Sequence, residues 1–185
     1  FFEKTIKNIF GLKCIIPTHQ GRAAERILFS VLCKSNDVIP SNSHFDTTRA
    51  NIEYQGSQAL DLIPEAFTDT QKYLPFKGDM DIGKLNSLIE KYTATKIPLI
   101  MLTVTNNSGG GQPVSMDNIR QVSKIAKKHN IPFYLDACRF AENAYFIKLR
   151  DAKYKNHNIL DIVKEMFSYA DGCTMSAKKD GIANI

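Results

Sequence analysis

The feature that most constrains the fold is a nearly continuous apolar run at 98–104. A strand that is exposed on one face alternates apolar and polar residues, whereas a strand buried on both faces is apolar throughout. A Gly-rich loop follows at 107–111, and Ser115 then caps a helical pattern that ends near 129–130. The next apolar segment, 131–135, leads into Asp136. This alternation of buried strands and helices predicts an α/β domain with a mostly parallel sheet.

Shorter apolar or periodic segments predict the remaining elements. The chain of 185 residues is long enough for one domain with a real core. It begins at Phe1 and ends within an apolar stretch, so we expect residues 1–185 to be an internal part of a longer protein. The expected elements are a strand at 13–16, a helix at 22–33, a loop at 35–43 around Pro40, strand and turn within 51–63, a helix at 82–89 capped by Asp81, a helix at 159–169 and a last strand at 172–175.

Composition excludes several classes of protein. A hydrophobic content of 43% and a charged content of 23% are those of an ordinary soluble globule, and no apolar run approaches the ~18 residues of a membrane helix. The net charge of +5 comes from scattered lysines without interleaved aromatics, so neither nucleic acid nor membrane is an expected partner. Cys14, Cys33, Cys138 and Cys173 form no CxxC pair, which indicates neither zinc nor disulfides. We expect a cytoplasmic protein.

Polar residues follow several of the predicted strands. They are Gln20-Gly21-Arg22, Asn107, Asp136 and the segment 176–179. Because the carboxyl ends of parallel strands meet at one edge of a sheet, these groups are expected to line one crevice.

Two of these groups are those that a pyridoxal phosphate (PLP) enzyme requires. A lysine amine forms an imine with the cofactor aldehyde, and either Lys178 or Lys179 could supply it. A carboxylate such as Asp136 keeps the pyridine nitrogen protonated. An exposed lysine pair and a helix-capping aspartate are the ordinary alternatives, so the prediction depends on the whole set of residues.

Each of the other candidates is weak evidence alone, and together they support this set. Gln20-Gly21-Arg22 at a helix start suits a phosphate, with Arg22 or Ser176 completing the cradle, although a plain strand-to-helix turn would look alike. Asn107 and Arg139 could approach the phenolic oxygen of the cofactor, but turns also favour asparagine. Phe45 could stack on the cofactor ring or belong to the core.

Four segments resemble a known family. They are 17–22 (PTHQGR), 110–116 (GGQPVSM), 139–148 (RFAENAYFIK) and 176–180 (SAKKD), and they resemble the aromatic amino-acid β-eliminating lyases, tryptophanase and tyrosine phenol-lyase. The resemblance covers essentially the whole chain. It implies the central part of a three-layer, fold-type-I PLP-binding large domain, with an N-terminal segment and a C-terminal small domain outside residues 1–185. It further implies a homotetramer activated by a potassium or ammonium ion.

The resemblance also implies a role for each matching residue. It places the Schiff-base lysine at Lys179 and the pyridinium partner at Asp136, and it makes Lys178 the neighbouring lysine that organises active-site water. The phosphate contacts would be Gln20, Gly21, Arg22 and Ser176, the stacking ring Phe45, the phenolic-oxygen partners Asn107 and Arg139, and the cation ligand the carbonyl of Asn184.

Asp46 is the clue to the substrate. An aspartate here resembles tryptophanase, which converts L-tryptophan to indole, pyruvate and ammonia, whereas tyrosine phenol-lyase has a threonine at this position. The segment 166–175 and Asn184 look more like tyrosine phenol-lyase, and Gly109 replaces a more usual alanine. The first expectation is β-elimination of L-tryptophan, with L-tyrosine as the alternative. A threonine-aldolase-like lyase and an inactive interaction module remain further alternatives.

Overall fold

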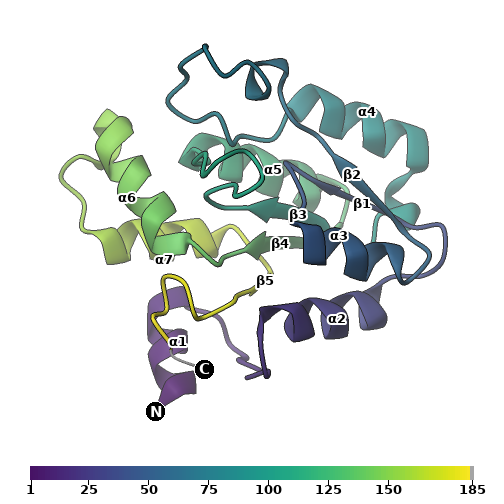
Figure 1. Cartoon of the computed structure of the whole chain (residues 1–185), viewed down its shortest axis with the longest axis horizontal. Coiled ribbons are helices and arrows are strands. Elements are labelled where there is room, and N and C mark those ends of the chain that lie inside the picture. Colours follow the sequence, from purple (N-terminus) through teal and green to yellow (C-terminus); the bar gives the residue numbers. More distant parts are fainter. Residues whose placement is uncertain (184–185) are drawn as a thin grey trace.

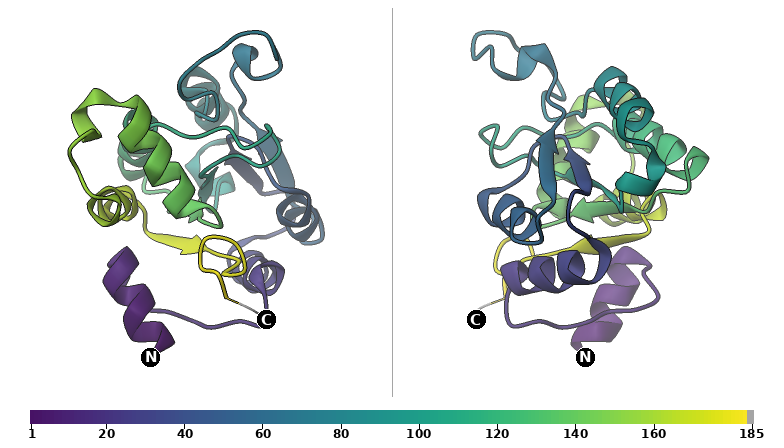
Figure 2. Two further views of the ribbon diagram at one scale, coloured as in Figure 1. Left: turned by 60° about the vertical axis from the view of Figure 1, so that its left-hand side comes forward. Right: turned by 90° about the vertical axis from the view of Figure 1, so that its right-hand side faces the viewer.

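The structure, a computed structural model, describes residues 1–183 and consists of alternating helices and short strands (Figure 1). The helices cover a central layer of strands on both faces (Figure 2). The α-helices are α1 (Phe2–Phe10), α2 (Gly21–Leu32), α3 (Asp46–Glu53), α4 (Ile82–Tyr92), α5 (Met116–Lys128), α6 (Phe140–Arg150) and α7 (Ile159–Ser168).

The strands form two sheets, and every strand pair in them is parallel. One sheet has the order β1-β2 and the other the order β3-β4-β5, and β1 lies next to β3 (Figure 1). The expected mostly parallel sheet is thus confirmed, in two parts. The strands are β1 (Val38–Ser41), β2 (Gln58–Asp61), β3 (Ile100–Thr103), β4 (Phe133–Asp136) and β5 (Gly172–Thr174).

Successive residues of the central strands pack into two separate apolar clusters. Ile100 and Leu102 belong to a cluster with residues of α1, α4, α5, α6 and α7, whereas Leu99 and Met101 belong to a cluster with Phe29 of α2 and Ile52 of α3. Side chains of a strand point alternately to its two faces, so β3 must be apolar at every position. This arrangement explains the apolar run at 98–104 and gives the domain three layers.

A buried amide joins the two sheets. Asn42, which directly follows β1, accepts a hydrogen bond from the backbone N–H of Thr103 (2.9 Å) and donates to the Thr103 carbonyl (3.0 Å). Its amide also donates to the carbonyl of Gly78 (2.7 Å). These bonds connect the end of β1 to the end of β3 without a strand ladder, and they fix two strand ends at the same edge of the central layer.

Most predicted elements around the candidate site are confirmed. The strands β3, β4 and β5 and the helices α2, α4, α5 and α7 lie where the sequence patterns indicate, with ends shifted by a few residues. The predicted caps also form: Asp81 accepts a hydrogen bond from the N–H of Lys84, and Ser115 accepts one from the N–H of Asn118.

Two of the predictions are wrong. Residues 13–16 form no strand, and Ile16 is 78% exposed, because three apolar residues without a neighbouring strand bury too little surface to order the backbone. The expected loop at 35–43 contains β1, in which Pro40 pairs with Leu60 of β2. The region 51–63 is strand only at β2, and its first residues end α3.

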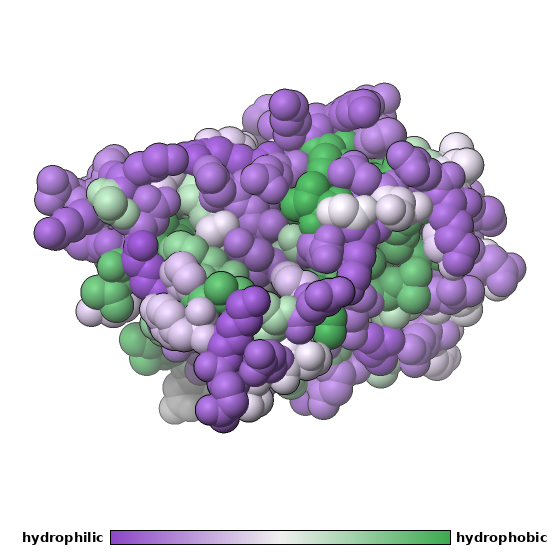
Figure 3. All heavy atoms as spheres, turned by 90° about the horizontal axis from the view of Figure 1, so that it is seen from above, coloured by the Kyte–Doolittle hydropathy of each residue, from purple (hydrophilic) through white to green (hydrophobic). Residues whose placement is uncertain are grey.

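The surface seen from above is mostly hydrophilic, with apolar side chains scattered among polar ones (Figure 3). Within residues 1–183, no helix combines the length and the apolar composition that crossing a bilayer requires.

Candidate active site

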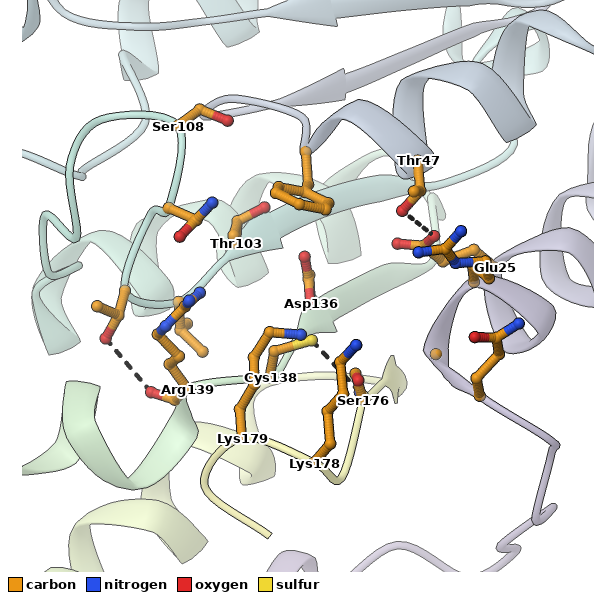
Figure 4. A pocket seen from close by; sticks show the side chains of 17 residues that line it. Glu25, Thr47, Thr103, Ser108, Asp136, Cys138, Arg139, Ser176, Lys178 and Lys179 are labelled. Carbon is orange, nitrogen blue, oxygen red and sulfur yellow. Dashed lines mark hydrogen bonds between the residues drawn. The ribbon is translucent and has the colours of Figure 1, made fainter. Parts of the chain in front are cut away.

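The carboxyl ends of the three strands β3, β4 and β5 meet at one edge of their sheet. Thr103, Asp136 and Thr174 are paired across this edge, so Asp136 lies at the end of the central strand. A cavity opens beyond it, and its wall includes residues from 20–25, 45–47, 103–108, 136–139 and 176–179 (Figure 4). The site is therefore at the position where open parallel sheets bind their ligands.

Asp136 is an acid that the fold buries almost completely. Its residue is 5% exposed, and burial raises the pKa of its carboxyl, although hydrogen bonds from Cys138 and the charges of Lys179 and Arg139 oppose the rise. None of the ion pairs within residues 1–183 includes Asp136. A buried carboxylate of this kind is costly unless a cation pairs with it. The site therefore suits a ligand that presents a positively charged N–H at this point.

The loop after β5 brings both lysines into the cavity. Lys178 and Lys179 extend from this loop towards Asp136 (Figure 4). Asp180, the next residue, fixes the loop: its carboxylate accepts hydrogen bonds from the backbone N–H groups of Ala141 (2.8 Å) and Glu142 (2.9 Å). Asp180 thus caps the first turn of α6, and it holds the lysines beside the start of that helix.

A second contact joins the same loop to the segment that follows β4. The backbone N–H of Ser176 donates to the sulfur of Cys138 (3.3 Å), as drawn in Figure 4. Burial raises the pKa of the Cys138 thiol to about 12, so this side chain stays a neutral thiol near pH 7. The thiol is placed to connect the loop to the segment after β4 rather than to act as a nucleophile.

The start of α2 forms the opposite end of the cavity. Gly21 is the first helical residue, and its N-cap residue Gln20 makes no side-chain cap hydrogen bond. A Cβ atom at Gly21 would lie 2.7 Å from the Cβ and 3.1 Å from the Cα of Ser176, so only glycine lets the helix start approach this close. Gln20, Gly21, Arg22 and Ser176 line one part of the cavity, with the amino end of a helix directed at it.

The loop after β3 has a strained residue at its start. Thr105 is buried with φ 51°, a conformation that a β-branched residue rarely adopts. The side chain of Asn143 holds it in place, because its Oδ1 accepts hydrogen bonds from the N–H groups of Thr105 and Val114 (2.9 Å each). Its amide donates to the Val114 carbonyl (3.0 Å). This strained, pinned turn presents Asn107 to the cavity.

Nearly all residues predicted for the site line this one cavity. Two predicted residues do not: Asp46 is exposed at the start of α3 and is not part of the cavity wall, and Asn184 lies outside the described residues. The predicted residues that the fold brings together are Gln20, Gly21, Arg22, Phe45, Asn107, Asp136, Arg139, Ser176, Lys178 and Lys179.

Glu25 and Thr47 are among the wall residues that the sequence patterns missed. Glu25 occupies a buried position in α2, where a helical pattern read alone assigns a glutamate to solvent. The signal available was the pair Thr47-Thr48 directly after Phe45, since adjacent hydroxyls can satisfy a buried carboxylate.

The charges of the cavity wall favour an anion. It contains four cationic side chains, Arg22, Arg139, Lys178 and Lys179, and two acids. The acids are Glu25 and Asp136, and both have a raised pKa because they are buried. The arrangement therefore offers an anion site at one end, a buried acid at the centre and a primary amine beside it.

Comparison with known proteins places these features in a family. The beta-eliminating lyase family matches residues 1–185. The chain is 54% identical over 183 residues to a probable beta-eliminating lyase of Trichomonas vaginalis, 54% identical over 185 residues to a tryptophanase of Hyphomonas neptunium and 50% identical over 183 residues to a tyrosine phenol-lyase of Pasteurella multocida. These matches cover 99 to 100% of the chain but only 40% of each relative.

Solved structures show the same fold at lower identity. A complex of SepCysS with the SepCysE N-terminal domain matches 99% of this chain and 43% of its own, with a TM-score of 0.65 and 21% identity. A putative aromatic amino acid beta-eliminating lyase/threonine aldolase from Exiguobacterium sp. 255-15 matches 96% of this chain and 44% of its own, with a TM-score of 0.61 and 15% identity. Alanine aminotransferase from Pyrococcus furiosus matches 72% with a TM-score of 0.55 and 18% identity. The expected fold-type-I architecture is confirmed.

Proposed function

The chain belongs to the beta-eliminating lyase family, and we propose that the protein containing it is a PLP-dependent carbon–carbon lyase that cleaves an aromatic L-amino acid. The observation that carries the proposal is the meeting of Asp136, Lys179 and the Gly21–Ser176 contact in one cavity. Residues 1–185 would be the central part of the PLP-binding large domain, and they match 40% of the length of the relatives.

The residues of the cavity fit PLP at three points. Asp136 is a buried acid without an ion pair in the described part of the chain, as a protonated pyridine nitrogen requires. The close approach of Gly21 to Ser176 forms a cradle that any side chain would fill. Lys179 offers a primary amine to the aldehyde. When bound, PLP supplies an electron sink for the carbon that loses its proton.

The protein's own groups would divide the work as follows. Gln20, Gly21, Arg22 and Ser176 would hold the phosphate, and Asp136 would hold the proton on the ring nitrogen. The Nζ of Lys179 would hold the aldehyde and, once released, accept the α-proton of the substrate, because it is already placed beside that carbon.

Three further residues would orient the cofactor and surround it with charge. Asn107 and Arg139 would donate to its phenolic oxygen, and Lys178 would remain a second cation near the reacting atoms. Phe45 would stack on the ring.

We propose L-tryptophan as substrate, with L-tyrosine as the second candidate. Asp46 supports tryptophan by its resemblance to tryptophanase, although its side chain is exposed beside the cavity and is not part of the cavity wall. Relatives named for either activity are of similar identity, at 54% and 50%. The homotetramer, the potassium or ammonium ion and the cytoplasmic location remain predictions.

The test uses the complete protein purified with added PLP. We expect a visible absorbance band that borohydride abolishes, because reduction of the imine leaves the pyridoxyl group attached to Lys179. The Lys179→Ala variant should lack the band, whereas Lys178→Ala should keep it. A protein that stays colourless with excess PLP would refute the enzyme assignment and favour an interaction module.

Assays of product then decide the substrate. We expect indole and pyruvate from tryptophan, whereas phenol from tyrosine without indole would overturn the use of Asp46. Cleavage of threonine alone would indicate an aldolase-type lyase.

A further inference from the structure

Glu25 is a buried acid in the cavity wall to which the proposed chemistry gives no role. The residue is 7% exposed, although it belongs to α2, a helix with one face towards solvent. Burial raises the pKa of its carboxyl, and repulsion from Asp136 raises it further. An apolar residue would occupy this position at lower cost, so the carboxyl must be compensated by specific contacts.

Those contacts come from two adjacent hydroxyls on another helix. Thr47 donates to one carboxylate oxygen of Glu25 (2.9 Å), and Thr48 donates to the other (2.5 Å). The Thr47 bond faces the cavity and is drawn in Figure 4. Because both oxygens of Glu25 accept a hydrogen bond from α3, the carboxyl holds that neighbouring segment in place.

The segment it holds is the first turn of α3. The turn follows Phe45, the N-cap residue, whose side chain makes no capping bond. Glu25 itself lies one turn after Gly21, at the start of α2. The contact therefore joins the helix start that would bind the phosphate to the helix start that would carry the stacking ring.

We propose that Glu25 is a positioning residue that fixes Phe45 over the cofactor ring relative to the phosphate cradle at Gly21. The inference rests on the proposed function, because it assigns the two connected helix starts to two parts of PLP. Glu25 acts through Thr47 and Thr48, and it does not touch the reacting atoms.

The helix pair offers a matched control. At its solvent side, the guanidinium of Arg26 lies 3.6 Å from the ring centre of Tyr54, so this contact also joins α2 to the end of α3. Neither residue lines the cavity. Arg26→Ala loosens the same two helices without acting on Phe45, and it separates a positioning effect from general destabilisation.

The experiment measures PLP binding to the complete protein by two signals. One is the dissociation constant, and the other is the visible circular dichroism of PLP at saturation, which reports the orientation of the bound ring. In Glu25→Gln the amide nitrogen cannot accept a hydrogen bond from a threonine hydroxyl and can only donate to it, so that hydroxyl has to turn and a charge-assisted contact becomes a weaker neutral one. We expect the dissociation constant to rise about tenfold and the dichroism per bound PLP to change. Arg26→Ala should leave both signals unchanged.

The threonines supply an independent comparison. Thr48→Val removes the hydroxyl at nearly constant shape and should repeat the effect of Glu25→Gln, whereas Thr48→Ser keeps the hydroxyl and should behave as the unmodified protein. Combined Glu25→Gln and Thr48→Val should cost little more than either change alone, because both break one contact. If Glu25→Gln does not fold, the valine and serine variants decide the question by the same two signals.

Three results would overturn the inference. Glu25→Gln with unchanged affinity and dichroism would refute it, and so would equal effects of Glu25→Gln and Arg26→Ala. Additive losses in the double variant would show that Glu25 acts by another route. Absence of PLP binding in the unmodified protein would instead refute the proposed function, and this inference with it. That result is obtained before any variant is made, so the two failures are distinguished.

Discussion

Replacing Asn143 with leucine should loosen the turn that presents Asn107 to the cavity. Asn143 is fully buried, and its amide satisfies three backbone groups: the N–H of Thr105, the N–H of Val114 and the carbonyl of Val114. Leucine has nearly the same size but no polar atoms, so all three groups would lose their partner without a large cavity being formed. The change therefore isolates the hydrogen bonds from the packing.

The magnitude follows from these three groups. A buried backbone group left without a partner costs about 1–3 kcal/mol, and the strained φ of Thr105 gives the turn a reason to relax once it is released. Because water can reach part of the opened turn, we expect a local loss of about 3–5 kcal/mol. Hydrogen exchange of the segment 104–115, followed by mass spectrometry in the native complete protein, measures this opening free energy directly.

The Asn143→Asp variant refines the prediction. Its carboxyl keeps an acceptor for both N–H groups, and only its protonated form can also donate to the Val114 carbonyl. Burial should raise its pKa in the folded state, so the variant should be most stable at low pH and lose stability, relative to the unmodified protein, as pH rises above the unfolded value near ~4. Unchanged exchange at 104–115 in Asn143→Leu, or a pH trend of opposite sign in Asn143→Asp, would refute this account of the turn.

Two further predictions concern the ends of other helices. Gly21→Ala should weaken PLP binding by at least about tenfold, because its Cβ would lie 2.7 Å from the Cβ of Ser176. Gly83→Ala on the exposed face of α4 should not weaken it, and equal affinities of the two variants, measured by titration, would contradict the proposed cradle. Burial raises the pKa of Asp79 to about 6, so the folded protein holds this proton more tightly than the unfolded chain and should lose about 3 kcal/mol of stability between pH 4 and 6. Asp79→Asn can still accept a hydrogen bond from the N–H of Ser115, and it should remove this fall in the free energy of urea unfolding as pH rises from 4 to 6. An unchanged dependence of that free energy on pH would show that Asp79 is not its source.

Strand positions were predictable where both faces of the sheet are covered. The run at 98–104 leaves no alternative to a buried strand, and β3 is found there with both of its faces packed. Residues 13–16 look similar over too short a length, and no strand forms. β1 escaped prediction because Pro40 and the polar residues after it suggest a loop, yet Asn42 is satisfied by Thr103, 61 positions further along the chain. Local sequence does not contain such partners.

The candidate site was predictable in its residues more than in its connections. Lysine, aspartate and glycine types at strand ends indicate chemistry by themselves, and the cavity contains Lys179, Asp136 and Gly21 together. The contacts that hold them in place join separate elements, as Asp180 does with α6 and Glu25 with α3. The residue type at a single position cannot reveal a hydrogen bond whose second partner lies on another helix.

The contact of Gly21 with Ser176 has a consequence for the synthesis of the protein. The two halves of the proposed phosphate cradle lie far apart in the sequence, and the loop after β5 is fixed only after α6 has formed to receive Asp180. A chain emerging from the ribosome therefore carries α2 and its helix start long before the second half of the cradle exists. Contacts so distant in sequence form late. The proposed site is complete only after the loop after β5 has emerged, so PLP would not serve as a nucleus around which the nascent chain folds.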